Sequence, residues 1–388
     1  MDSHRADKRG RALEWWVLGG TVFVSFVDTF ALLPVLPVYM RQIGAQPWQI
    51  GMLLSVYSLV GMAGQPLGGY VADVVGRKRP LVFSLLGSAV ALGLYGAVPS
   101  VWWLLAMRVL HGLSGSLFLP ALFALLGERA GRQRAQVMGR AAALIGLAAI
   151  VAPPVSGVIA RLWGAPMVFG IVAALMALAA IGVWYTVPDT LLPAVEPRRL
   201  RPWEVLRVPS LRAVYALTAA FTFCMGTLAY GFPLLMVERG YTTATAGKLL
   251  GWMALVAVPV MAFLRWRQFF ARAVLGLGIV LLSLLGIWWA HGVALLVLCM
   301  GLYGVGFGLI FPAVHVLTFE QAPAEQRGSA FALLYVAYSG GLIAGPAAAG
   351  VLSAVVLPAV VAAGLAAGIL IGVVTWNLRQ RWGWSVRP

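Results

Sequence analysis

The chain has 388 residues, of which 61% are hydrophobic and only 10% are Asp, Glu, Lys or Arg. About a quarter of the residues of a soluble protein are charged, so this composition excludes an ordinary soluble protein and predicts one whose solvent is the lipid bilayer. The net charge of +16 could indicate nucleic-acid binding, but the basic residues are spread over short connections between apolar runs, which argues against that class.

Apolar runs of about 20 residues recur along the whole chain, and each is long enough to cross about 30 Å of hydrocarbon as a helix. The short alternating segments of a transmembrane barrel do not occur in the sequence. We therefore predict an all-helical membrane protein with twelve transmembrane helices. The expected spans are residues 15–40, 48–71, 80–98, 101–126, 137–160, 165–187, 211–236, 245–264, 271–290, 293–318, 328–352 and 355–377.

Most of the 28 Lys and Arg residues lie in every second connection and in the two terminal segments. Cytoplasmic loops carry an excess of Lys and Arg, so this bias predicts that both termini lie in the cytoplasm and that the protein is a multi-pass protein of the cell membrane. The basic residues expected on the outer side are few: Arg41, Arg161, Arg239 and Lys248.

The two halves of the chain repeat. Glu128 and Pro154 correspond to Glu320 and Pro346 at one constant offset, and the longest polar connection separates the halves. Parallel repeats of six helices predict two similar bundles related by an axis along the membrane normal, with a site between them at mid-membrane. The expected domains are an N-terminal bundle over 1–187, a cytoplasmic linker over 188–210 and a C-terminal bundle over 211–388.

A glycine-punctuated charged turn follows the second span. It resembles the loop 2–3 signature of the Major Facilitator Superfamily, Gly-x-x-x-Asp-Arg-x-Gly-Arg-Arg. The matching residues are Gly69, Asp73, Gly76, Arg77 and Lys78. Val74 stands where the family has arginine, so the resemblance does not supply a gating contact from that position. The resemblance covers essentially the whole chain and implies a transporter that works by alternating access.

Two further patterns resemble the twelve-span drug:proton antiporters of this superfamily. The first span contains Asp28 followed by Pro34, Pro37 and Tyr39, and the fourth contains Arg108 with His111 in place of a glutamine. The resemblance implies a monomeric, proton-coupled exporter of lipophilic or cationic drugs. It would need no cofactor, with protons as the coupling ion, and its partners would be a small lipophilic substrate and membrane lipids.

Asp28 and Arg108 reach the same depth from different helices. Asp28 lies about 20 Å from the cytoplasmic edge of its span, and Arg108 lies about 10 Å from the outer edge of its own. An unpaired charge in hydrocarbon costs at least about 2.5 kcal/mol, so both should face a wet central cavity. We expect Asp28 to bind the coupling proton with Arg108 as its counter-charge, and His111 to share that face of the fourth helix. A static buried pair that only fixes helix packing is the alternative.

Asp73 and Glu128 end the second and fourth spans, at helix C-termini that disfavour an acid. Arg77 is the expected partner of Glu128. The resemblance implies that Asp73 also meets the N-terminus of the eleventh helix and closes an inner gate. The gating set would be Gly69, Asp73, Gly76, Arg77, Lys78 and Glu128. The alternative is that the basic residues of this turn only fix the orientation of the chain in the membrane.

Proline and glycine pairs predict helix kinks and close helix contacts, at Pro154, Gly157, Gly345 and Pro346. Aromatic residues of the C-terminal half could line a substrate cavity, although such residues also serve as simple packing. The candidate lining residues are Phe223, Met225, Tyr230, Tyr303, Phe307, Phe311, Tyr335 and Tyr338. His291 and His315 are expected near span ends, as interfacial residues.

Other functions are weighed on the same residues. A lipid or glycolipid flippase, or a lysolipid transporter, would need a larger cavity that opens sideways. A sugar or metabolite transporter would need more Asn, Gln and acidic groups within the spans than this chain has. An enzyme finds no support, because the sequence offers no nucleophile and base pair, no metal cluster and no phosphate loop. Cys224 and Cys299 fall within apolar runs and read as packing residues.

Overall fold

The computed structural model describes residues 2–97, 99–188, 205–323 and 326–352, with three isolated glycines beyond them; the side chains of residues 2–11 and of Arg132 lie outside this description. Within these ranges every regular element is a helix, which confirms the all-helical class. The helices are α1 (Asp2–Leu32), α2 (Leu36–Gln42), α3 (Pro47–Val75), α4 (Lys78–Tyr95), α5 (Val101–Ala130), η1 (Gly131–Gln133), α6 (Arg134–Trp163), α7 (Ala165–Thr186), α9 (Pro209–Glu238), α10 (Thr243–Phe263), α11 (Phe269–Trp289), α12 (Val293–Gln321) and α13 (Arg327–Leu352).

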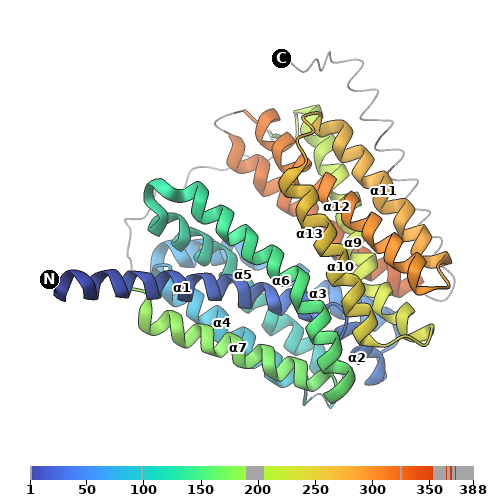
Figure 1. Ribbon diagram of the computed structural model, residues 1–388, viewed down its shortest axis with the longest axis horizontal. Coiled ribbons are helices and arrows are strands. Elements are labelled where there is room, and N and C mark those ends of the chain that lie inside the picture. The colour runs from blue at the N-terminus through green and yellow to red at the C-terminus, as the bar shows by residue number, and fades with distance from the viewer. Residues whose placement is uncertain are drawn as a thin grey trace. The chain divides into compact units, whose positions relative to one another are not determined.

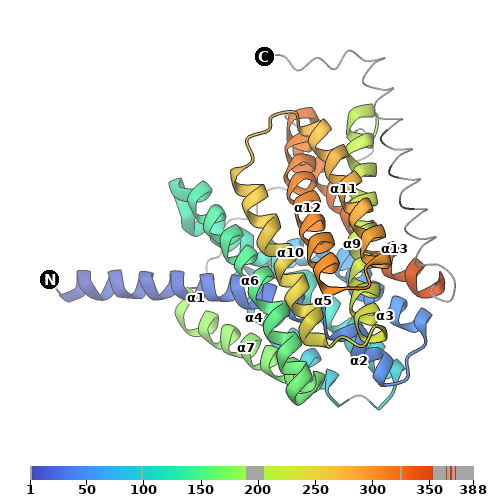
Figure 2. The same ribbon diagram turned by 45° about the vertical axis from the view of Figure 1, so that its right-hand side comes forward.

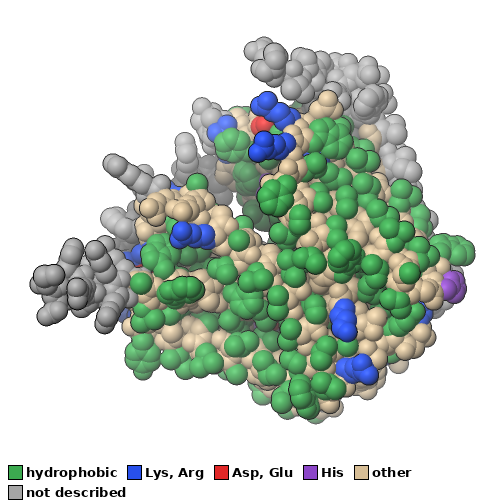
Figure 3. Space-filling view, viewed as in Figure 1, with side chains coloured by type: hydrophobic (Ala, Val, Ile, Leu, Met, Phe, Trp, Pro, Cys, Tyr) green, Lys and Arg blue, Asp and Glu red, His purple; other side chains and the backbone are tan. Residues whose placement is uncertain are grey.

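Ten of the helices in the described ranges are long and apolar enough to cross a membrane. Helix α4, of 18 residues, occupies the third predicted span. Each predicted span from 48–71 to 328–352 coincides with one helix, and the first, 15–40, covers parts of two. The last, 355–377, lies outside the described ranges apart from the isolated glycines. Figure 3 shows hydrophobic side chains over most of the face that it draws, with Lys and Arg at scattered points. Such a surface suits contact with lipid.

The first predicted span is interrupted near its end. Helix α1 ends at Leu32, and α2 begins at Leu36. Pro34 has no N–H to continue the helix and disfavours helical backbone in the residue before it, while Pro37 fits within the first turn of α2. Two turn-like bonds, one of them from Val35 N–H to the Leu32 carbonyl at 3.2 Å, bridge the break. The predicted single helix is therefore two helices.

The chain divides into two compact units. The first contains residues Met1–Gln46, Val56–Glu196 and Pro233–Gly251, and the second contains Pro47–Ser55, Pro197–Phe232 and Trp252–Pro388. Each unit thus includes a short stretch from the other half of the sequence. Residues 189–204, most of the predicted linker, lie outside the described ranges, and the predicted domain boundaries stay a prediction.

In the first unit, α1, α4, α6 and α7 lie side by side (Figure 1), and α4 also packs along α5. The α4–α5 contact is close because Gly87 faces the Ser114 hydroxyl, leaving no room for a larger residue. The start of α10 packs on α6 in the same way. A Cβ at Gly157 would lie 3.1 Å from the Ala244 Cα, and the Thr243 hydroxyl donates to the Gly157 carbonyl at 3.0 Å.

In the second unit, α11 and α12 run side by side (Figure 2), joined at Gly276 and Gly306. Helix α13 packs on α9 through Gly345, where a Cβ would lie 2.9 Å from the Thr227 amide nitrogen. The start of α3 also packs on α13, at Pro346, and the Ser55 hydroxyl there donates to the Ile343 carbonyl at 2.7 Å. Small residues let helix backbones approach in this manner within a membrane.

Two neighbouring glycines of α13 test these contacts. A Cβ at Gly341 would lie 2.7 Å from the Phe223 amide nitrogen and would also meet Thr222, whereas a Cβ at Gly340 would meet nothing within 4 Å. We expect Gly341→Ala to lower the thermal unfolding midpoint of the purified protein, because overpacking costs about 1–3 kcal/mol. The matched control, Gly340→Ala, should leave the midpoint unchanged or raise it, because alanine favours helix more than glycine does. Equal midpoints for the two variants would contradict this packing.

Candidate functional site

A carboxylate and an imidazole meet in the interior of the first unit. Asp28 comes from α1 and His111 from α5, and their side chains are only 4% and 1% exposed. The Oδ2 atom of Asp28 lies 3.0 Å from Nε2 of His111. Among intramembrane groups, such ionisable pairs mark ion and substrate pathways. The structure thus joins two of the residues that the sequence predicted for proton coupling.

Two tyrosines and Arg108 extend this pair. The Tyr95 hydroxyl, from the end of α4, lies 3.1 Å from Nδ1 of His111 and accepts a hydrogen bond from Arg108 at 3.4 Å. The guanidinium of Arg108 also lies over the ring of Tyr57, 4.6 Å from its centroid. The result is a buried chain from Arg108 through Tyr95 and His111 to Asp28, with Tyr57 packed against it. We call these five residues the polar cluster.

The cluster differs in one respect from the sequence-based expectation. The sequence predicted Arg108 as the counter-charge of Asp28 and gave His111 a lesser place; the structure puts His111 in hydrogen-bond range of the carboxylate. The other oxygen of Asp28, Oδ1, is buried and has no hydrogen-bond partner among the described residues. A buried acceptor without a partner carries a desolvation cost, so it is a place where an added proton or water gains a bond.

Sequence reasoning missed Tyr57 and Tyr95. Both lie within predicted spans, and nothing in their spacing distinguishes them from the other aromatic residues of the chain. Tyr95 is fully buried, and its backbone carbonyl accepts a hydrogen bond from the Tyr39 hydroxyl at 2.7 Å. A buried phenol usually needs a hydrogen-bond partner for its hydroxyl. If the burial of Tyr95 were known, this need would link it to the polar residues of neighbouring helices.

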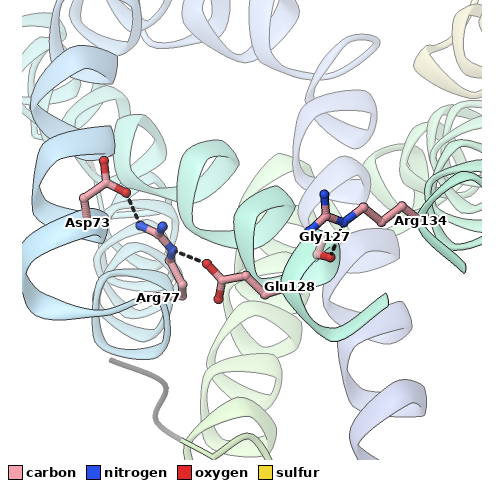
Figure 4. Close-up of polar contacts among 5 residues, drawn as sticks. All are labelled: Asp73, Arg77, Gly127, Glu128 and Arg134. Carbon is pink, nitrogen blue, oxygen red and sulfur yellow. Dashed lines mark hydrogen bonds and ion pairs between the residues drawn. The ribbon is translucent and has the colours of Figure 1, made fainter. Parts of the chain in front are cut away.

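The charged turn between α3 and α4 holds an ion-pair network at the end of the first unit (Figure 4). Arg77 donates to Glu128, at the end of α5, at 2.9 Å and also to Asp73, one turn earlier in the chain. Burial lowers the pKa of Arg77, but its hydrogen bonds to Glu128 and Asp73 raise it by more, so the net shift is upward. The expected Arg77–Glu128 pair is therefore present, and the guanidinium stays charged.

The other residues predicted for the gate have different surroundings. Gly76 has φ of 95°, a backbone conformation that favours glycine, so it permits the tight turn. Lys78 places its ammonium 5.2 Å from the ring centre of Trp184. Gly69 has open space where a Cβ would lie, so packing within the described residues does not require glycine there. A gating role for this set stays a prediction.

The predicted cavity residues separate into two groups within the second unit. Phe307 and Phe311 of α12 stack with centroids 5.5 Å apart, and Tyr338 of α13 meets Phe311 edge-on at 6.5 Å. Tyr303, on the same face of α12, is fully buried, and its hydroxyl has no hydrogen-bond partner among the described residues. Tyr335 is exposed, and its ring centroid lies 6.2 Å from that of His315.

The remaining three cavity candidates lie on α9. The hydroxyl of Tyr230 donates to the Pro47 carbonyl at 3.3 Å, which fixes it at a helix contact. Phe223 and Met225 are half-buried, and the backbone of Phe223 forms part of the close contact with Gly345. Phe221, one turn from Met225, contacts the α12 rings, with its ring centroid 5.2 Å from that of Phe307.

Two ion pairs were not anticipated from the sequence. Arg41 donates to Glu238 at 2.7 Å, and Glu14 lies 3.0 Å from Arg129. The sequence places each of these charges at the end of a span but contains no signal for its partner. As for metals, no group of three or more His, Cys, Asp or Glu residues in the described part of the chain could hold an ion.

Double-mutant cycles test the ion-pair network at the turn. Glu128 is 19% exposed and Asp73 is 60% exposed, so the surroundings of the first carboxylate screen its charge far less. We expect the cycle of Arg77→Gln with Glu128→Gln to give a coupling free energy of unfolding of about 1 kcal/mol or more, and the matched cycle with Asp73→Asn to give a few tenths. Equal couplings, or a larger one with Asp73, would contradict the geometry.

The comparisons with known proteins agree with this architecture. Residues 18–269 match the family model described as Major Facilitator Superfamily. The chain is 24% identical over 350 residues to a multi-drug resistance efflux pump PmrA homolog of Lactococcus lactis subsp. lactis, covering 85% of each chain. It is 27% identical over 359 residues to the multidrug efflux protein YfmO of Bacillus subtilis, covering 87% of this chain and 86% of that protein.

A solved structure shares the fold across nearly the full length. The crystal structure of a bacterial homolog to the human lysosomal transporter Spinster, in an inward-facing and occupied conformation, aligns with a TM-score of 0.79 at 15% identity. That alignment covers 97% of this chain and 99% of the other. The helical architecture, the charged turn and the family match lead to one conclusion: the chain belongs to the Major Facilitator Superfamily and is a membrane transporter.

Proposed function

We propose that this protein exports lipophilic or cationic drugs across the cell membrane in exchange for protons. The names of two relatives, a multi-drug resistance efflux pump homolog and a multidrug efflux protein, support the choice of cargo. The observation that carries proton coupling is the buried contact of Asp28 with His111 at 3.0 Å. Transport proceeds by alternating access, with both termini in the cytoplasm and with the monomer as the working unit.

The polar cluster has a consistent direction of hydrogen bonding when His111 is neutral and protonated on Nε2. Arg108 then donates to the Tyr95 oxygen, the Tyr95 hydroxyl donates to Nδ1 of His111, and Nε2–H donates to an ionised Asp28. In this state the charges of Asp28 and Arg108 cancel. The protein therefore holds both charges in the membrane without a net charge in the cluster.

An added proton changes that balance. It is shared by Asp28 and His111, and it raises the net charge of the polar cluster by one. A more positive cluster disfavours a cation bound near it. Proton binding and cation binding therefore compete, which is the coupling that an antiporter needs.

The ion pairs and close helix contacts supply parts for the conformational cycle. Arg77 holds Glu128 and Asp73 at the end of the first unit that we assign to the cytoplasm. Gly157, near the end of α6, contacts the start of α10, and Pro346, near the end of α13, contacts the start of α3. Charged pairs that can break, beside dry contacts between small residues, allow helices to separate at one end and stay packed at the other.

Flux through the reconstituted protein tests the central assignment. We expect Asp28→Asn to reduce drug efflux driven by a pH gradient at least about tenfold, because an amide cannot release a proton, while the dissociation constant for the drug changes much less. Efflux of a fluorescent dye from proteoliposomes, with and without an imposed gradient, measures the first quantity. Binding to purified protein measures the second.

A second carboxylate provides the control. Glu320 is an exposed acid near the end of α12, and Glu320→Gln removes the same charge from a position outside the polar cluster. Gradient-driven flux should therefore remain close to that of the unmodified protein. If Asp28→Asn transports as fast as the unmodified protein under the same gradient, proton coupling through this carboxylate is wrong.

Removal of the Arg108 charge should shift the pH dependence of transport. The guanidinium lies one hydrogen bond from Tyr95, which contacts His111, so its positive charge opposes proton binding by the pair. Arg108→Gln removes this opposing charge, and the midpoint of the pH profile of transport should move to higher pH. A midpoint that stays in place, in a variant that still folds and binds drug, would contradict the electrostatic role of Arg108.

A further inference from the structure

Three rings from two helices of the second unit surround His315. On α12, Phe307, Phe311 and His315 follow one another at four-residue spacing, so they share one face of the helix. The His315 ring lies 4.7 Å from Phe311, and on α13 it meets Phe331 at 6.4 Å and Tyr335 at 6.2 Å. We call His315 and these three neighbouring rings, Phe311, Phe331 and Tyr335, the histidine box.

The hydrogen bonding of His315 defines what the box can accept. Its Nδ1 lies 2.7 Å from the carbonyl oxygen of Phe311, one turn earlier in α12. A carbonyl oxygen only accepts, so Nδ1 must carry the hydrogen. In the neutral imidazole the other nitrogen, Nε2, is then a bare acceptor. Among the described residues nothing donates to it.

The side chains of the histidine box are partly exposed. His315, Phe311 and Phe331 are half-buried, and Tyr335 is 52% exposed. The other faces of α12 are already occupied by helices, because Gly304 and Gly308 contact α10, and Gly306 contacts α11. The ring-bearing face is therefore the accessible side of α12 toward α13, and its side chains are the ones that a bound molecule would meet.

The charges of the second unit restrict the ligand further. Among the described residues of the second unit the only carboxylate is Glu320, which is exposed and lies more than one helical turn past His315. A cation in the box would meet no counter-charge from these residues. It would meet aromatic faces, which attract cations, and the lone pair of Nε2, which accepts a hydrogen bond.

We propose that the histidine box binds the ammonium group of lipophilic amines that carry an N–H, with His315 Nε2 as the hydrogen-bond acceptor. The stacked rings of Phe307 and Phe311 extend from the box along α12 and receive the apolar part of the same molecule. A quaternary ammonium has the charge but no N–H, so it gains only the attraction to the rings. The box therefore distinguishes amines with an N–H from quaternary amines.

This inference deepens the proposed function, because it names the cargo of the same transporter, but its test needs no proton gradient. The probes are imipramine, a ring-bearing tertiary amine that is protonated at neutral pH, and its N-methyl quaternary derivative. Isothermal calorimetry with the full-length protein in lipid nanodiscs gives the two dissociation constants. We expect imipramine to bind about tenfold more tightly than the quaternary derivative.

Substitutions at His315 assign that difference to the nitrogen. His315→Phe keeps a ring and removes the acceptor, so the dissociation constant of imipramine should rise about tenfold while that of the quaternary derivative stays the same. His315→Gln, whose amide oxygen accepts hydrogen bonds, should restore part of the difference. Phe311→Leu should weaken both ligands by the same factor, because both contact the rings.

A matched control comes from the other described histidine of the second unit. His291 also has Nδ1 at 2.7 Å from a carbonyl oxygen, that of Trp289, but it is exposed at the end of α11. His291→Phe should change neither dissociation constant. If His315→Phe does not fold, His315→Leu removes the same nitrogen with a smaller side chain and carries the same expectation.

The outcomes separate this inference from the proposed function. If His315→Phe keeps the preference for imipramine, or weakens both ligands equally, the acceptor role of His315 is wrong even where gradient-driven flux is normal. If the preference for imipramine is present and depends on His315 while Asp28→Asn transports normally, the role of the histidine box is supported and proton coupling through Asp28 is wrong.

Discussion

The arrangement of the first unit depends on one constraint: an ionisable group within a membrane must have a partner of matching chemistry. Asp28, His111 and Arg108 come from two helices, and Tyr95 from a third connects them. Each of these side chains is nearly inaccessible, so a group that lost its partner would bear a desolvation cost. The cluster fixes how α1, α4 and α5 face one another, and one added proton changes its net charge. The same hydrogen bonds therefore hold the three helices together and carry the proposed proton coupling.

Much of the fold follows from the sequence because bilayer thickness fixes helix length. The predicted spans coincide with helices over the described ranges, and the family signature at the charged turn led to the correct superfamily. Pro34 and Pro37 predict a disturbance of the first helix at this place. Hydropathy alone does not tell a kink from a break, so the division into two helices needed the structure. The stretches that each unit takes from the other half, such as Pro47–Ser55, depend on packing that a linear pattern does not contain.

The site was predicted less completely, for a physical reason. A carboxylate or a guanidinium among apolar residues is conspicuous, so Asp28 and Arg108 stood out. Tyrosines are ordinary in a membrane helix, and only three-dimensional proximity gives Tyr57 and Tyr95 a role. His315 was read as an interfacial residue because depth along a helix says nothing about its neighbours. Its ring contacts come from α13, and its tautomer from a bond within α12. The chemistry of a side chain depends on where it points and on which groups it contacts, and tertiary structure sets both.

The exchange of short stretches between units has a consequence for how the protein assembles. Pro233–Gly251 completes the first unit, and Pro47–Ser55 completes the second. A ribosome that has finished the first half of the message has therefore not yet supplied every residue of the first unit. Neither half made as a separate polypeptide contains one whole unit, so each fragment of a chain divided at the linker would lack a stretch that packs in its unit.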